Sequence, residues 1–210
     1  MELREVLEKA QEKVMEAYEQ RNEIQRASRR ITKLAKRAIF AVHEGDLKGA
    51  RELLEEAGAE LRGLKEFLLR RPDVGSLGVL NPAFQEYAEA EIFLALISGS
   101  EVPGFEELEI PPEQYVLGLA DVIGELRRRA LEALRKGSLR EAEDFLSLME
   151  EIYMELISLD EAQAVISELR RKCDIARRLL EATRGDITVE ARRISLEEAL
   201  RRLEDLLRRS

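Results

Sequence analysis

Two pairs of carboxylates at helical spacing are the residues of this chain best suited to chemistry. Glu86 and Glu89 lie three positions apart, and Asp121 and Glu125 lie four apart, so each pair occupies one face of a helix. Ionised carboxylates are rarely buried unless they are paired, hydrogen-bonded or bound to a metal. The face that carries Glu86 and Glu89 nevertheless continues through apolar side chains, namely Phe93, Leu96 and Ile97.

Two such pairs could line a pocket with oxygen atoms, the ligands that Mg²⁺ and Mn²⁺ prefer. A divalent cation there would polarise a phosphate, lower the pKa of a bound water and stabilise a leaving oxygen, which is the chemistry of phosphodiester hydrolysis. Acid pairs are common in a chain with 43 acidic residues, so surface salt bridges such as Glu125 with Arg128 are the alternative. Gly118 and Gly124 flank the second pair and indicate close approach to the helix backbone, either by a ligand or by a neighbouring helix.

A run of basic residues follows one face of the first long helix, opposite its apolar face. No Asp or Glu interrupts this run between Arg26 and Arg37. The pattern is typical either of a solvated helix face or of a stripe that binds phosphates. The basic stripe consists of Arg26, Arg29, Arg30, Lys33, Lys36 and Arg37.

Composition sets limits on these interpretations. The chain has 210 residues, of which 45% are hydrophobic and 37% charged, as in globular proteins. Its net charge of −9 argues against nucleic-acid binding when taken alone, although the distribution of charge decides binding. No apolar run is long enough to span a membrane, and the charged N-terminus does not resemble a signal peptide. The single cysteine, Cys173, fits a reducing compartment, so we expect a cytoplasmic protein.

Helical periodicity and capping residues divide the chain into seven expected helices. We predict an all-α, single-domain seven-helix bundle over residues 1–210. Asn81 is expected to cap the third helix ahead of Pro82. Ser138 with Glu141 and Ser195 with Glu198 are expected to form capping boxes. The expected helices cover residues 2–43, 46–70, 82–98, about 112–136, 138 onward, 160–184 and 195–209, with loops at 71–80 and 98–111.

Three blocks of sequence resemble one known family. Phe84-Gln85-Glu86-Tyr87-Ala88-Glu89-Ala90 resembles the Gln-Glu-Tyr-x-Glu-Ala signature of translin-associated factor X. The segment from Tyr115 to Leu126, which contains Gly-Leu-Ala-Asp-Val-Ile-Gly-Glu-Leu, resembles a second block, and residues 27–43 resemble the family's first helix. The blocks occur in family order. The chain is therefore identified as a member of the translin superfamily, closer to factor X than to translin.

The resemblance implies a metal-dependent endoribonuclease that binds and cleaves single-stranded RNA. The family's catalytic and metal-binding carboxylates correspond to Glu86, Glu89, Asp121 and Glu125, with Mg²⁺ or Mn²⁺ as the cofactor. The basic stripe becomes the RNA-binding face, with single-stranded DNA as a further ligand. The family closes its protomers into a hollow shell, which implies a homo-oligomer here, expected to be an octamer. The alternatives are a non-catalytic RNA or single-stranded DNA binder of the translin type, and a helical scaffold.

Three further features have weaker signals. His43, the only histidine, could act as a general base, and the basic segment around Cys173 could lower the pKa of its thiol. For both residues an incidental or structural role is the favoured interpretation. A strongly apolar segment forms either part of a subunit interface or the bundle core; it comprises Phe145, Leu148, Met149, Ile152, Tyr153, Leu156 and Ile157.

Overall fold

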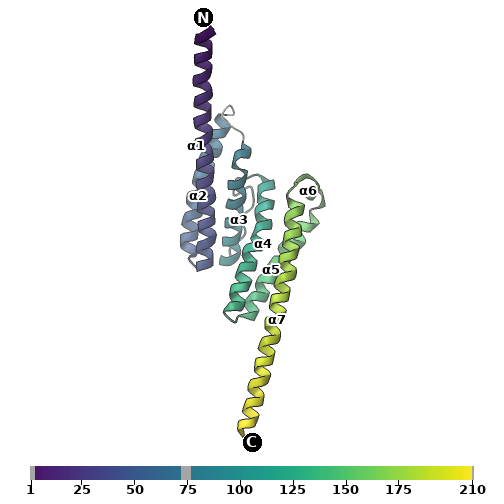
Figure 1. Ribbon diagram of the computed structural model, residues 1–210. Coiled ribbons are helices and arrows are strands. Elements are labelled where there is room, and N and C mark those ends of the chain that lie inside the picture. The colour runs from purple at the N-terminus through teal and green to yellow at the C-terminus, as the bar shows by residue number, and fades with distance from the viewer. Residues whose placement is uncertain (1–2, 72–76, 210) are drawn as a thin grey trace. The chain divides into compact units, whose positions relative to one another are not determined.

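The computed structural model describes residues 3–71 and 77–209, and these residues form helices without any strand (Figure 1). The all-α architecture with seven α-helices is confirmed. In chain order the elements are α1 (Leu3–Glu44), α2 (Leu47–Arg70), the 3₁₀ helix η1 (Leu77–Leu80), α3 (Asn81–Ser98), α4 (Pro112–Arg135), α5 (Leu139–Ser158), α6 (Asp160–Val165) and α7 (Leu169–Arg209). No helix among the described residues is long and apolar enough to cross a membrane.

The chain divides into two compact units, one ending at Gly118 and the other beginning at Leu119, so α4 contributes to both. In the first unit, α1, α2 and α3 pack on one another. Its fully buried side chains include Ile31, Leu54, Phe84 and Phe93. In the second unit, α5 packs along α7. Its fully buried side chains include Ile123, Leu126, Met149 and Leu156.

Several helix ends follow the signals in the sequence. Gly45 ends α1 with φ of 85°, a left-handed conformation that favours glycine. Asp46 caps α2, because its Oδ1 accepts a hydrogen bond from the backbone N–H of Gly49 at 2.9 Å. Gly99 and Gly137 follow α3 and α4, also at positive φ. The helix ends expected near residues 43, 46, 98 and 136 are therefore confirmed to within one or two residues.

Other predicted caps are wrong. Asn81 is the first residue of α3 and not its cap, because η1 leads directly into α3 and Leu80 takes the cap position. Residues 72–76 of the predicted loop lie outside the described residues, and residues 77–80 form η1. Ser138 precedes α5 but makes no side-chain capping hydrogen bond. The capping box with Glu141 therefore does not form.

The C-terminal helices also differ from the prediction. The helix expected over residues 160–184 is interrupted, because Ile166 adopts an extended conformation and is buried, as is Leu169. Beyond that break, α7 continues without a stop through Ser195, where a new helix was expected. Arg193 pairs with Glu190 and with Glu197, contacts between successive helical turns that favour a continuous helix.

The two glycines of α4 have different surroundings. A Cβ at Gly118 would lie 2.7 Å from the carbonyl oxygen of Gln85 and 3.0 Å from the backbone nitrogen of Glu89. Gly118 therefore lets the backbone of α4 approach α3, and the neighbouring-helix interpretation is confirmed there. A Cβ at Gly124 would meet no atom within 4 Å.

We expect Gly118→Ala to destabilise the protein by about 1–3 kcal/mol, because the added methyl group overlaps backbone atoms that cannot rotate away. Gly124→Ala is the matched control on the same helix, and we expect it to be neutral or to stabilise by up to about 1 kcal/mol through helix propensity. Urea unfolding at neutral pH measures both. Equal effects of the two substitutions would contradict the close approach at Gly118.

Both ends of the described chain carry exposed apolar side chains on helices. Every residue from 3 to 16 of α1 is exposed, and so is every residue from 195 to 208 of α7. Seven of the apolar residues at these helix ends recur at spacings of three, four or seven positions, as they do along the seam of a coiled coil. They are Leu3, Leu7 and Val14 in α1, and Leu196, Leu200, Leu203 and Leu207 in α7.

Candidate functional site

In the first unit, the acid Glu86 lies against the basic stripe. Its Oε1 is 3.1 Å from the Nζ atom of Lys36, and its side chain is 22% exposed. Packing of α3 on α1 produces this contact, because Glu86 lies on α3 and Lys36 lies on α1. The ion pair therefore joins one predicted catalytic acid to one predicted RNA-binding residue.

Glu89 lies one helical turn further along α3 and is buried, with 9% of its surface exposed. It shares this burial with most of the helix, which is apolar on nearly all sides. The expectation that the two acids lie on a largely buried face is confirmed for Glu89 and in part for Glu86. A carboxylate in such surroundings needs polar or cationic partners to remain ionised.

A buried acid that the sequence analysis did not single out is Glu91, which is only 7% exposed. Its Oε2 accepts a hydrogen bond from Arg51 Nη1 at 3.4 Å, and it also accepts one from the hydroxyl of Tyr87. Burial raises the pKa of Glu91, while Tyr87 and Arg51 oppose that rise. Burial likewise raises the pKa of the Tyr87 phenol. These contacts join α2 to α3 and hold the helix that carries Glu86 and Glu89.

This network predicts a pH dependence of stability. A carboxyl whose folded-state pKa is raised binds more protons when folded, so its contribution to stability is complete below the ordinary value of 4.5 and is lost as the pH rises through the folded-state value. As the pH increases from 4.5 through the folded-state pKa of Glu91, wild-type protein should therefore lose stability relative to Glu91→Gln. Chemical unfolding across the pH range measures the difference, with the exposed Glu12→Gln as control. Parallel curves for wild type and Glu91→Gln would contradict the raised pKa.

In the second unit, Asp121 of α4 pairs with Lys172 of α7. The distance from Lys172 Nζ to Asp121 Oδ1 is 2.5 Å, and the lysine side chain is only 10% exposed. Glu125, one turn along α4, is half-buried. Lys172 was not a predicted site residue, because it lies 51 positions from Asp121 and no local pattern connects them.

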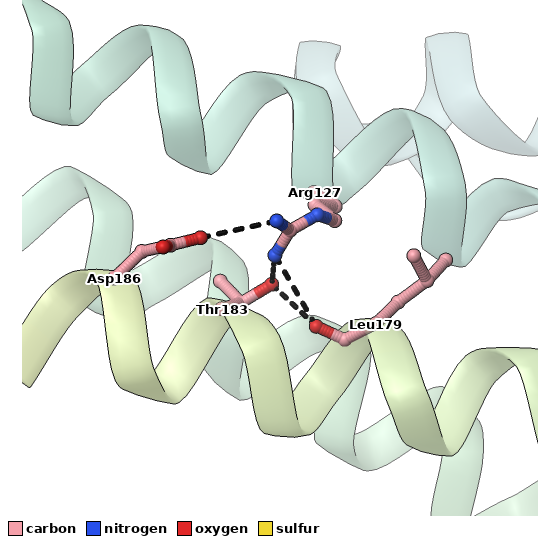
Figure 2. Close-up of polar contacts among 4 residues, drawn as sticks. All are labelled: Arg127, Leu179, Thr183 and Asp186. Carbon is pink, nitrogen blue, oxygen red and sulfur yellow. Dashed lines mark hydrogen bonds and ion pairs between the residues drawn. The ribbon is translucent and has the colours of Figure 1, made fainter.

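A second set of contacts, made by four residues, holds α4 against α7 (Figure 2). Arg127 reaches across from α4, and its Nη1 donates to Thr183 Oγ1 at 2.6 Å and to the carbonyl oxygen of Leu179 at 3.4 Å. Its Nη2 pairs with Asp186 Oδ2 at 3.0 Å. Since Arg127 lies two positions after Glu125, these bonds orient the part of α4 that carries the second acid pair.

The donor chemistry of the acid pairs fits a hard cation. Each unit contains one acid pair, Glu86 with Glu89 in the first and Asp121 with Glu125 in the second. Among the described residues, no three His, Cys, Asp or Glu side chains form a group that could hold a metal ion. Mg²⁺ commonly binds to one or two carboxylates and completes its coordination with waters and substrate phosphates, so two acids on one helix are a suitable set. The assignment of Mg²⁺ or Mn²⁺ to these acids stays a prediction.

The six residues of the basic stripe are all exposed on α1. Two of them make ion pairs, Lys36 with Glu86 and Arg30 with Glu60 at 3.6 Å. For the other four, the described part of the chain supplies no acidic partner within ion-pair distance; these are Arg26, Arg29, Lys33 and Arg37. An uninterrupted row of exposed cations is suited to a polyanion.

The weaker candidates are mostly structural. Cys173 is buried, and burial raises the pKa of its thiol with help from Asp174, which agrees with a structural or incidental cysteine and not with a reactive thiol. The ring of His43 packs against that of Phe93, with ring centroids 5.0 Å apart and ring planes tilted by 42°. In the apolar segment of α5, Met149, Ile152 and Leu156 are buried in the described chain and belong to the core.

The comparisons with known proteins agree with this architecture. The model of the Translin family matches residues 19–182. An uncharacterized protein of Methanocaldococcus jannaschii is 38% identical over 186 residues, which cover 88% of this chain and 82% of that protein. Among solved structures, AfC3PO is 32% identical with a TM-score of 0.76, and the match covers 88% of this chain and 96% of that one.

Two further structures match over the same shares of both chains, 88% of this one and 96% of the other. The complex of AfC3PO with duplex RNA is 31% identical with a TM-score of 0.76, and apo-NeC3PO is 26% identical with a TM-score of 0.75. The matched family region includes all four acids and the whole basic stripe. The chain belongs to the Translin family.

Proposed function

We propose that this protein is a metal-dependent endoribonuclease that binds and cleaves single-stranded RNA. The observation that carries the proposal is the ion pair between Lys36 and Glu86, because it brings the basic stripe and the first acid pair together within one unit. A strand bound along the stripe would have its phosphates next to a carboxylate. The duplex RNA bound to the related AfC3PO supports RNA as the class of ligand.

In the proposed reaction, water attacks the phosphorus of a phosphodiester in the RNA backbone. One P–O bond to the adjoining ribose breaks, and the leaving ribose oxygen takes up a proton from solvent, so the products are a phosphomonoester end and a hydroxyl end. A Mg²⁺ or Mn²⁺ ion bound to the carboxylates would supply polarisation of the phosphate and compensation of its developing charge. Neither acid pair has a histidine beside it in the sequence, so we assign removal of the proton from the attacking water to a carboxylate of the set. The ammonium group of Lys36 can rotate from Glu86 to a phosphate oxygen, since lysine donors are flexible.

We further propose that the protein acts as a homo-oligomer, expected to be an octamer. The exposed apolar residues at the start of α1 and at the end of α7 support assembly, since a row of leucines at coiled-coil spacing is stabilised by a matching row from another copy. Closed symmetric assembly is the usual outcome for such homo-oligomers. Enclosure would place the basic stripes of several copies around one strand.

A non-catalytic binder of RNA or single-stranded DNA is the second candidate. The observation that favours it is that lysines already pair with two of the acids, Lys36 with Glu86 and Lys172 with Asp121. In a binder these pairs would be permanent, and the acids would serve only to orient the cations.

A nuclease assay separates the two candidates. Purified protein, sized by light scattering, is incubated with a labelled single-stranded RNA in Mg²⁺, in Mn²⁺ and in EDTA, with a duplex RNA in parallel. We expect cleavage with either metal and none in EDTA. A preparation of Asp121→Asn made in the same way controls for contaminating nuclease. Binding without cleavage under every metal condition would leave the binder as the function.

A further inference from the structure

A pocket in the second unit lies beside Asp121, and its lining includes two cations that belong to neither the acid pairs nor the basic stripe. It has a volume of about 240 Å³ and lies between α4 and α7. Its lining combines the acid Asp121 and the cations Arg171 and Lys172 with small and apolar side chains, among them Gly124.

Two cations of α7 line this pocket, and they differ in burial and in ion pairing. Lys172 is nine-tenths buried and held by Asp121, so its ammonium group has a fixed position at the pocket. Arg171 is exposed, and no acid in the described chain pairs with it. A buried ammonium beside an exposed guanidinium forms a site for an anion with several oxygen atoms, because the guanidinium can donate two parallel hydrogen bonds to such a group.

Gly124 keeps the pocket open. A Cβ at this position would meet no atom within 4 Å, so packing against a neighbouring helix does not explain the glycine. A glycine inside a helix costs up to about 1 kcal/mol relative to alanine, which makes an unpacked one unusual. The absence of a side chain leaves room between Asp121 and the cations of α7.

We propose that this pocket takes a phosphate group of the bound RNA strand, held by Arg171 and Lys172 beside Asp121. The inference rests on the proposed RNA binding and extends the contact surface beyond the basic stripe of α1. The site positions the strand: Arg171 binds a phosphate oxygen, and Lys172 divides its donors between that phosphate and Asp121. Asp121, which repels the phosphate, would also limit how tightly the strand is held.

The test is RNA binding in EDTA, so that cleavage plays no part in the readout. A labelled single-stranded RNA is titrated over a range of salt concentrations with wild type and with Arg171→Gln. Loss of one single-strand phosphate contact should make the slope of log K against log salt shallower by about 0.7 and weaken binding about fivefold near 0.1 M salt. Arg178→Gln, which removes a charge from an exposed position of α7 outside the pocket, is the matched control and should have little effect.

A second variant tests the pocket without changing any charge. Gly124→Leu fills the space between α4 and α7 and should also weaken binding, while circular dichroism remains that of the wild type. Equal effects of Arg171→Gln and Arg178→Gln, or full binding by Gly124→Leu, would overturn the phosphate site. If variants of the basic stripe weaken RNA binding and Arg171→Gln does not, the proposed function stands and the phosphate site is contradicted. If wild-type protein binds no RNA, both the proposed function and the phosphate site are contradicted. If RNA is bound but not cleaved, the proposed catalysis is contradicted and the result for the phosphate site is unaffected.

Discussion

Asp121→Asn protein is expected to retain RNA binding and to lose cleavage by on the order of 100-fold or more, and Glu86→Gln and Glu89→Gln should behave in the same way. A divalent cation stabilises the transition state of phosphate hydrolysis by several kcal/mol, and losing about 3 kcal/mol of that stabilisation corresponds to about 100-fold in rate. The amide substitutions keep the size of each side chain, so burial of Glu89 and packing of α3 should be preserved.

The four acids should act together in catalysis and not independently. Combining two substitutions should therefore cost little more than either one alone, because the first already removes the bound cation. Glu125→Gln is expected to have a smaller effect if its carboxylate holds a water and not the cation. Glu132→Gln is a matched control, since Glu132 lies on the same helix, α4, but pairs with Arg135 away from the acids. Single-turnover rates with saturating protein measure all of these variants. Full activity in Glu86→Gln, Glu89→Gln and Asp121→Asn would eliminate the catalytic assignment.

The second large effect concerns the basic stripe. Reversing three of its charges, in the triple variant Arg29→Glu, Lys33→Glu and Arg37→Glu, should weaken RNA binding by on the order of 100-fold near 0.1 M salt. The salt dependence should become shallower by about 2 in log–log slope, about 0.7 for each phosphate contact. These three side chains are exposed and have no acidic partner within ion-pair distance in the described chain, so the fold should not change.

A control with the same change in net charge distinguishes the stripe from general repulsion. Arg4, Lys9 and Lys13 are exposed on the same helix but lie before the stripe, so their triple reversal to Glu should weaken binding far less. Fluorescence anisotropy with a labelled single-stranded RNA measures both triple variants. If the two triples weaken binding equally, or neither does, the stripe is a solvated helix face.

Local chemistry in the sequence determined the fold class and most helix ends. Glycine at positive φ and an aspartate that can accept a backbone hydrogen bond act within a few residues, and Gly45, Asp46 and Gly99 lie where the expected helix ranges end or begin. Helical spacing likewise placed Glu86 with Glu89, and Asp121 with Glu125, on shared faces. The same local rules failed at Ser195, because a serine followed by a glutamate three positions later is also compatible with an exposed helix interior.

Tertiary structure alone decided which side chains meet. Lys36 with Glu86, Arg51 with Glu91 and Lys172 with Asp121 are 40 or more positions apart, and each pair comes from two packed helices. Burial also decided the pKa of the Cys173 thiol: its basic neighbours in the sequence left a lowered pKa open, whereas burial raises it. Such contacts depend on how helices pack, and packing is set by the whole apolar surface of each unit. The acids and the stripe could therefore be predicted from the chain, whereas the lysines that pair with the acids, and the pocket beside Asp121, required the folded structure.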